Sequence, residues 1–218
     1  MAGSGIVFIG FVLTHMYGNL KAFAGHEAFN EYAHHLRTFG EPMLPYEGLL
    51  WVLRIVLILS LVVHVGSAVA LARRAGQART VKYAARKYSS SISSRTMRWG
   101  GLTILVFLVW HLVNFTIGKV NVNPDPSPNT GANHTADPFL LMVDTFDVWW
   151  MTIIYLIAML ALAMHLHHGT WSALQTLGLT NSARSRKNAK LAGWVVAIVI
   201  AGGFSLVPLA VLTGVISK

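Results

Sequence analysis

Cysteine is absent from this chain of 218 residues, and charged side chains are scarce. Without cysteine the chain cannot form a disulfide, ligate an iron–sulfur cluster or attach a c-type haem covalently. Only 11% of the residues are charged, 54% are hydrophobic, and the mean hydropathy is +0.55. This composition is too apolar for a soluble domain of the same size, so it indicates an integral membrane protein.

Five apolar runs have about the length that a helix needs to cross roughly 30 Å of hydrocarbon. They lie at residues 2–20, 49–72, 99–119, 146–171 and 191–215. The first run resembles a signal peptide in position, but "THMYGNLKAF" lacks a small-residue cleavage site, so we expect a retained helix. The sequence therefore predicts an all-α integral membrane protein with five transmembrane helices, in a single membrane domain over residues 1–218.

Acidic residues are missing from two of the four segments between the runs. Segments 73–98 and 172–190 hold twelve of the 17 Lys and Arg residues and none of the eight acids. The positive-inside rule places both segments, and the N-terminus, in the cytoplasm of a cell whose inner or plasma membrane holds the chain. The net charge of +9 then reflects topology and contact with membrane lipid, and no nucleic acid partner is expected.

The two outer segments, about 21–48 and 120–145, are polar. "GHEAFNEYAHHLRTFG" predicts a short amphipathic helix on the surface, and "NPDPSPNTGANHTADP" is typical of a turn-rich loop.

Six of the ten histidines fall inside the apolar runs, and four of them, one in each of the first four runs, lie away from the helix ends, where imidazole is costly. At 1.5 Å per residue, His165 and His64 lie roughly 9 and 12 Å from the inner face. By the same measure His111 lies roughly 18 Å from that face and His15 about 9 Å from the outer one. The sequence thus pairs His64 with His165 at an inner level and His15 with His111 at an outer level.

A low-spin b-type haem takes two axial imidazoles from opposite sides, and facing helices of a bundle supply them. One histidine from each of the first four helices, matched in depth, predicts a bundle with two haems. A single intramembrane histidine is also explained by a hydrogen bond across helices, but four at two levels favour haem.

The remaining histidines have simpler interpretations. His167 and His168 end a helix and are expected at the interface. The others, in the outer segments, are expected to be solvated, with zinc binding by His34 and His35 as a minor alternative; they are His26, His34, His35 and His134.

The stretches "AFNEYAHHLRTF", "FLVWHLVNF" and "MHLHHGTWSALQTLG" resemble the five-helix, dihaem cytochrome b membrane anchor of succinate:quinone oxidoreductases, especially the single-subunit, menaquinone-linked type. The resemblance spans nearly the whole chain and includes H-x-x-x-G-x-W at His165, Gly169 and Trp171. The family usually has a cytoplasmic segment before its first helix, and almost nothing precedes the first helix here.

This resemblance implies that His64 and His165 ligate the proximal haem, near a cytoplasmic iron–sulfur subunit, and that His15 and His111 ligate the distal one. It also implies a flavoprotein as a second partner and quinone as electron acceptor, with menaquinone as the type that fits the resemblance. The chain would belong to a succinate dehydrogenase of the respiratory chain and carry no succinate chemistry itself.

Two arginines are candidate partners of haem propionates. Arg54 lies in the second run near its outer end, where a charge must be paired or snorkel, so pairing with a distal propionate and pairing with Glu47 or lipid phosphate stay open. Arg98 enters the third run and either pairs with a proximal propionate or only enforces topology.

Quinone reduction consumes two protons, so an ionisable group is expected near the quinone headgroup. The outer half offers Glu41, Glu47, Asp144 and Asp147, and the inner side offers no acid.

Two other functions fit less well. One is a dihaem transmembrane cytochrome that works without a succinate-oxidising partner. The other is a histidine-lined metal or proton transporter, which would normally add acidic counter-ligands within its spans.

Overall fold

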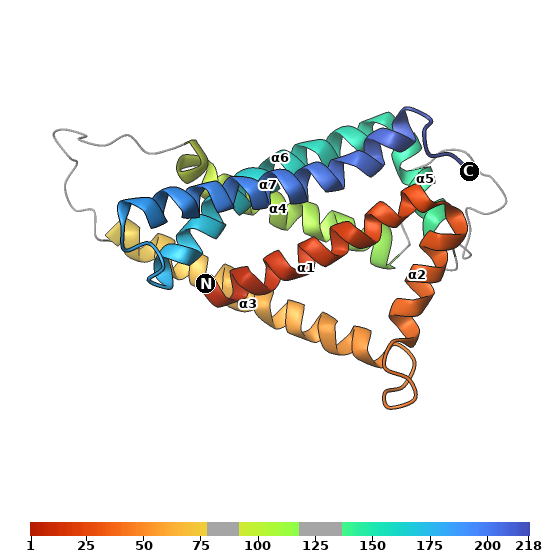
Figure 1. The fold of residues 1–218 in the computed structure, drawn as a ribbon, viewed down its shortest axis with the longest axis horizontal. Coiled ribbons are helices and arrows are strands. Elements are labelled where there is room, and N and C mark those ends of the chain that lie inside the picture. Colours follow the sequence, from red (N-terminus) through yellow and green to blue (C-terminus); the bar gives the residue numbers. More distant parts are fainter. Residues whose placement is uncertain (78–91, 118–136) are drawn as a thin grey trace.

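The computed structural model describes residues 1–77, 92–117 and 137–218, with the side chains of 92–96 excepted. These residues form helices and short connections, and no strand occurs among them. Figure 1 shows, in chain order, α1 Ala2–Leu20, the 3-10 helix η1 Lys21–Ala24, α2 His26–Thr38, α3 Gly48–Gln77, α4 Ile92–His111, the π-helix η2 Leu112–Ile117, α5 Pro138–Asp147, α6 Trp149–Thr176 and α7 Ala183–Leu212.

Five helical segments are long and apolar enough to cross a membrane, which confirms the prediction of an all-helical, multi-pass membrane protein for the part of the chain described. Their bounds are Ala2–Ala24, Gly48–Gln77, Met97–Ile117, Trp149–Thr176 and Ala183–Leu212. The predicted third run continues to residue 119, but 118 and 119 lie outside the described residues.

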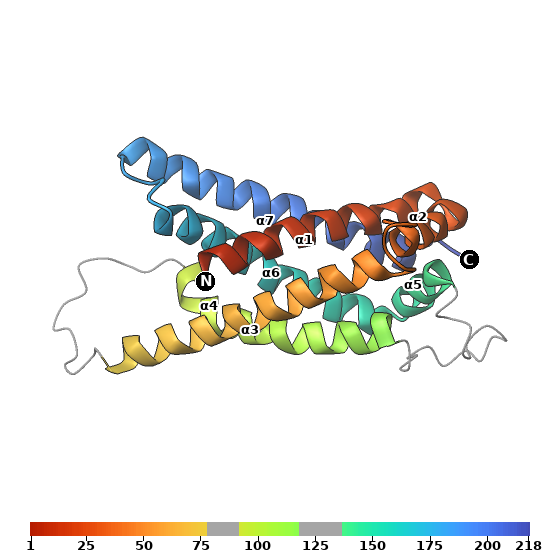
Figure 2. The same ribbon diagram turned by 90° about the horizontal axis from the view of Figure 1, so that it is seen from below.

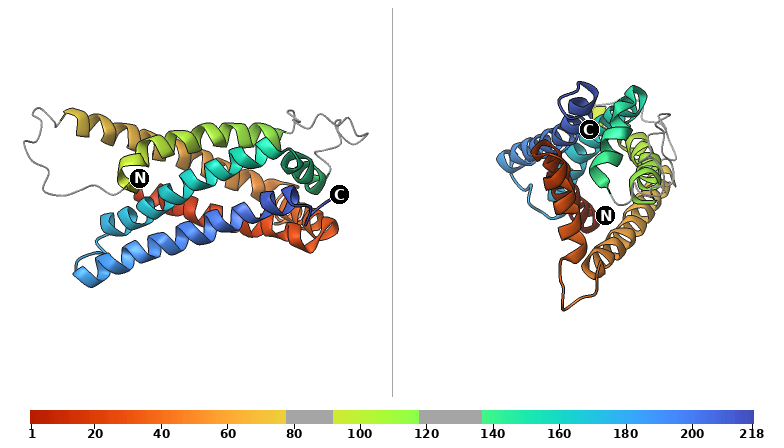
Figure 3. Two further views of the ribbon diagram at one scale, coloured as in Figure 1. Left: turned by 90° about the horizontal axis from the view of Figure 1, so that it is seen from above. Right: turned by 90° about the vertical axis from the view of Figure 1, so that its right-hand side faces the viewer.

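The spans form a bundle in which α6 and α7 pack side by side, while α4 and α1 pack against α6. The α3 helix lies on the opposite side of the bundle from α7, as Figures 2 and 3 show, and its main contacts are with α1 and α2. Although α3 is 30 residues long, none of its residues is buried. Helix packing therefore leaves every residue of α3 at least partly exposed.

A helix that was not predicted, α5, occupies residues 138–147, at the end of the second outer segment and the start of the predicted fourth run. Asp137 is the N-cap and accepts a hydrogen bond from the Leu140 amide, and Pro138 occupies the first turn, where its missing N–H costs nothing. Extended backbone at Val148 then separates α5 from α6, so the fourth span begins at Trp149 rather than at residue 146. The helix is almost wholly buried, and it packs against α2, α6 and α7.

The segment 172–190 is mostly helix rather than loop. The α6 helix continues to Thr176, and α7 begins at Ala183. A capping box starts α7: the Ser182 hydroxyl accepts from the Ser185 amide, and the Ser185 hydroxyl accepts from the Ser182 amide. Only the short connection between the two helices turns the chain around.

The bundle has two chemically different ends. The basic end, at the left of Figure 1, carries the N-terminus, the end of α3 and the connection between α6 and α7; the acidic end, at the right, carries α2, α5 and the C-terminus. The described charges of the basic end are Arg73, Arg74, Arg98, Arg184, Arg186, Lys187 and Lys190, whereas every described acid lies toward the acidic end, namely Glu27, Glu31, Glu41, Glu47, Asp137, Asp144 and Asp147. Arg79, Lys82, Arg86, Lys87 and Asp125 lie outside the described residues.

Candidate functional site

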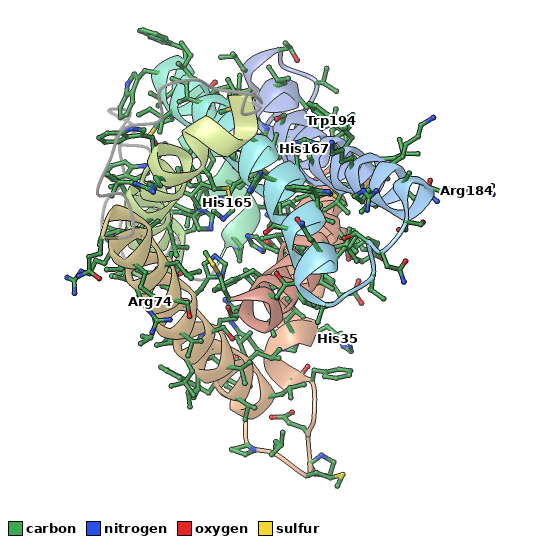
Figure 4. All side chains as sticks on the ribbon, turned by 90° about the vertical axis from the view of Figure 1, so that its left-hand side faces the viewer. His35, Arg74, His165, His167, Arg184 and Trp194 are labelled. Carbon is green, nitrogen blue, oxygen red and sulfur yellow. The ribbon has the colours of Figure 1, made fainter. Side chains whose placement is uncertain are left out.

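Two histidines face each other in the half of the bundle toward the basic end. The ring of His64 on α3 and the ring of His165 on α6 have centroids 6.1 Å apart. In the view from the basic end in Figure 4, His165 points into the middle of the bundle, whereas His167 points toward Trp194 on α7. This inner pair (His64 and His165) joins two helices that otherwise make few contacts.

Glycines lie next to both rings of the inner pair. A Cβ on Gly5 of α1 would stand 3.8 Å from Cε1 of His64, and a Cβ on Gly101 of α4 would stand 3.6 Å from Cε1 of His165. An added Cβ would make only ordinary van der Waals contact at either position, so neither ring requires a glycine there.

Hydrogen bonds favour one tautomer of His64. The Ser4 hydroxyl lies 3.2 Å from His64 Nδ1 and also donates to the Met1 carbonyl oxygen at 3.0 Å. Because a hydroxyl has one hydrogen, Ser4 Oγ is left to accept a hydrogen bond from the Nδ1–H group. The Nε2 atom of His64 then keeps its lone pair, as a metal ligand requires.

A second pair lies toward the acidic end. The rings of His15 on α1 and His111 on α4 have centroids 5.8 Å apart and stand nearly perpendicular, at 80°. Aromatic rings surround this outer pair (His15 and His111): His15 stacks on Phe11 at 5.4 Å, and Phe107 and Phe115 contact His111 at 5.8 and 5.3 Å. The Nδ1 atom of His111 lies 3.2 Å from the Tyr155 hydroxyl on α6.

The ring separations of both pairs match the distance expected for one metal ion between two imidazoles. A metal–imidazole bond of about 2.0 Å on each side puts two opposed ring centres roughly 6 Å apart. Among the described residues no group of three or more His, Asp or Glu side chains could hold a metal ion. Each pair therefore offers two histidines as ligands among the described residues.

Arg54 lies at the joint between α2 and α3. Its Nη1 atom is 3.4 Å from Glu47 Oε2, its guanidinium lies over the Trp51 ring at 4.9 Å, and Arg37 Nε contacts Glu47 Oε1 at 3.3 Å. Of the partners considered for Arg54, the structure thus places Glu47 in contact. Two guanidinium groups share one carboxylate, so the joint keeps a net positive charge. Arg98 is exposed at the basic end of α4, the end nearer to the inner pair.

The other described histidines contribute to packing. His167 stacks on Trp194 at 4.2 Å, so it packs against α7 rather than only facing the interface, and His168 contacts Trp171 edge to face. His34 and His35 lie on α2 and belong to no metal-binding group within the described ranges. His134 lies outside those ranges.

A polar clamp between α2 and α5 (His26, Asn30 and Asp137) was not predicted. His26 Nε2 is 2.6 Å from Asp137 Oδ2, Asn30 Nδ2 donates to Asp137 Oδ1 at 2.9 Å, and Asn30 Oδ1 accepts from the Phe139 amide at 3.1 Å. The sequence signal was present, because Asp137 and Pro138 together are typical of a helix start. The clamp also gives a structural role to Asn30, which lies in the stretch "AFNEYAHHLRTF".

The clamp lowers the pKa of the Asp137 carboxyl. Partial burial by itself raises this pKa, but hydrogen bonds from the Leu140 amide, Asn30 and His26, together with the charge of His26, outweigh the burial.

The acidic end also holds a buried carboxylate and a hollow. Asp144 is only 2% exposed and pairs with Lys218 Nζ at 2.6 Å. The hollow is lined by Ala22, Phe23, Gly25, His26, Phe139, Val215, Ile216, Ser217 and Lys218.

Comparison of the chain with protein-family models, with curated proteins and with solved structures gives no match. The function of the chain must therefore be inferred from its side chains and their positions.

Proposed function

We propose that this chain is the dihaem cytochrome b membrane anchor of a succinate:quinone oxidoreductase. The observation that carries the proposal is the presence of two neighbouring histidine pairs, the inner with ring centroids 6.1 Å apart and the outer with 5.8 Å. Each pair joins two different membrane helices, and the two pairs lie at different levels of the bundle. This is the ligand set that two b-type haems need.

The number of protein ligands supports haem over a bare metal ion. Structural zinc sites use four protein ligands and catalytic ones use three, whereas each site here offers two histidines among the described residues. Haem brings its own four nitrogens and needs only the axial pair.

The residues of the chain hold and orient the proposed cofactors. His64 and His165 would be the axial ligands of the inner haem, and His15 and His111 those of the outer one. When bound, haem supplies one-electron redox chemistry. The Ser4 hydroxyl holds His64 in the tautomer that ligates through Nε2, and the Arg37–Glu47–Arg54 joint keeps positive charge near the start of α3.

The two ends of the bundle suit different partners. We place the iron–sulfur and flavoprotein subunits at the basic end, on the cytoplasmic side, and the reaction with quinone at the acidic end. The hollow lined by His26 and Lys218 lies at that end, as do the acids from which protons would be exchanged. Quinone reduction beside the outer haem would then take its protons from the outer face.

The first test is the haem content of the purified chain. Two b-type haems per polypeptide, reducible and with visible absorption bands, are the expected result. A colourless chain, or one that binds a single haem, would contradict the proposal.

The second test removes one axial ligand at a time. We expect His64→Leu and His165→Leu to lose the same haem and to keep the other, and His15→Leu and His111→Leu to lose the second haem instead. Redox titration of each variant identifies the haem that remains. His35→Leu on α2 is the matched control and should keep both. If His64→Leu and His111→Leu lost the same haem, the pairing would be wrong.

Two alternatives remain distinguishable. Co-purification with a flavoprotein and an iron–sulfur protein separates the succinate-linked anchor from another dihaem transmembrane cytochrome. A metal-loaded chain without haem bands would favour a histidine-lined transporter.

A further inference from the structure

Behind the outer pair lies a chain of buried polar side chains. Asn114 is fully buried, Thr145 is 1% exposed and Tyr155 is 6% exposed. Polar groups in the apolar part of a membrane protein are costly unless they are hydrogen-bonded, and they are commonly kept for function. This buried polar chain (Asn114, Thr145 and Tyr155) therefore needs an explanation beyond packing.

A series of polar contacts leads from the helix α5 toward the imidazole of His111. The Thr145 hydroxyl donates to the Leu141 carbonyl at 2.7 Å, so its oxygen accepts from Asn114 Nδ2 at 3.3 Å. The Asn114 side chain also interacts with the Tyr155 hydroxyl. That hydroxyl lies 3.2 Å from His111 Nδ1.

A local change of helix type accompanies this arrangement. The α-helical turns of α4 end at His111, and the next six residues form the π-helix Leu112–Ile117, which contains Asn114. Such π-helical segments are frequent at functional sites, because the wider turn redirects side chains. Here the segment follows the proposed ligand directly.

A coordinated neutral imidazole carries its only N–H on the nitrogen that does not bind the metal. If His111 binds through Nε2, its Nδ1–H therefore donates to the Tyr155 oxygen. The Asn114 Oδ1 atom is buried and has no hydrogen-bond partner among the described residues, so it remains an unused acceptor behind the outer pair.

We propose that Tyr155, held by Asn114 and Thr145, is a positioning residue for the outer haem ligand His111. It fixes the tautomer and orientation of this imidazole and, by accepting the Nδ1–H hydrogen bond, makes Nε2 a stronger electron donor to iron. A stronger donor stabilises ferric iron, so the hydrogen bond lowers the midpoint potential of the outer haem. The inference rests on the proposed function, and it is specific to one haem because His64 uses Ser4 instead.

The decisive variant is Tyr155→Phe, which removes the hydroxyl and keeps the ring that packs on Phe107 and Phe146 at 4.8 and 4.9 Å. We expect this variant to keep both haems and to shift one midpoint potential upward, with a changed low-spin ferric EPR signal for the same haem. The shifted haem must be the one that His111→Leu loses. Ser4→Ala is the matched variant, and it should shift only the other haem.

A second variant keeps the inference testable if Tyr155→Phe does not fold. Thr145→Val removes the last hydroxyl of the chain at nearly constant volume, and it should shift the same potential upward by less. Tyr17→Phe, on a tyrosine that is 57% exposed, is the control and should change neither haem.

The possible outcomes separate the inference from the proposed function. Two haems with unchanged potentials in Tyr155→Phe, or an equal shift of both haems, would overturn the role of Tyr155 and leave the dihaem anchor intact. If only Thr145→Val yields folded protein, an unchanged outer potential in that variant would overturn it as well. Absence of haem from the unmodified chain would instead refute the proposed function.

Discussion

A close approach between α6 and α7 depends on a single residue, Gly193 of α7. A Cβ built on it would stand 2.5 Å from the backbone oxygen of His167 on α6 and 3.3 Å from Cδ2 of the same histidine. With no side chain there, α7 lies directly on α6, and Trp194 stacks on the His167 ring at 4.2 Å. Within a membrane the hydrophobic effect does not drive helices together. Small residues at helix contacts therefore matter, because they let the two backbones approach closely.

We expect Gly193→Ala to destabilise the chain by about 1–3 kcal/mol, because the backbone of α6 cannot move away as a flexible side chain would. Thermal unfolding in detergent, followed by circular dichroism, measures this effect. Gly202→Ala in the same helix is the control, since a Cβ there meets nothing within 4 Å. Equal midpoints for the two variants would show that the contact does not limit stability.

At the scale of elements, α2 and α5 are held together by polar side chains together with the edge-to-face contact of Phe29 with Phe139. No residue of α2 is buried, and the clamp formed by His26, Asn30 and Asp137 also caps the first turn of α5. Because α5 covers the acidic end and supplies Thr145 to the buried polar chain, the clamp indirectly positions the surroundings of His111.

The clamp should weaken in strong acid. Its hydrogen bonds hold the pKa of Asp137 below the ordinary value, so the folded chain binds a proton there less readily than the unfolded chain. The stabilisation from Asp137 is therefore complete above the unfolded pKa of about 3.9 and is lost as the pH falls through the lower, folded pKa.

Hydrogen exchange of the first α5 amides, compared with Asp137→Ala, measures this contribution, and we expect roughly five-fold faster exchange in the variant near pH 5, as loss of about 1 kcal/mol from an N-cap implies. Asp147→Ala, at the other end of α5, should exchange like the unmodified chain. A difference that persisted unchanged well below the folded pKa would contradict the assignment to the carboxylate.

The whole molecule is a bundle with charge separated along its length. All described acids lie toward the acidic end, and arginine and lysine dominate the other end. From this separation the positive-inside rule predicts that the basic end lies in the cytoplasm. That orientation would also put the inner histidine pair nearer to a soluble electron donor.

The absence of cysteine makes this orientation simple to test. Met43, which is 93% exposed in the connection between α2 and α3, and Asn181, exposed between α6 and α7, can each be replaced by a single cysteine. We expect a membrane-impermeant maleimide to label Met43→Cys in intact cells and Asn181→Cys only after permeabilisation. The reverse pattern would invert the topology and the assignment of partners to the two ends.

Much of this architecture could be predicted from composition and spacing. Each of the five apolar runs is by itself long enough to span the hydrocarbon core of the bilayer, so no tertiary contact is needed to find it. The levels of His15, His64, His111 and His165 follow from helix rise alone, and the structure places the same residues next to each other. The start of the helix α5 could have been predicted from Asp137 and Pro138. These two residues end a turn-rich stretch, however, and that stretch hid the helix signal.

The sequence by itself determined that the chain crosses a membrane, where its helices run, and which histidines share a depth, because these properties are set by local length and periodicity. Only the tertiary structure decided which side chains satisfy the polar atoms of those histidines. Ser4 reaches His64 across 60 residues, and Tyr155 reaches His111 across 44. Such contacts depend on how helices distant in sequence are rotated and packed against each other, and no local pattern records that rotation.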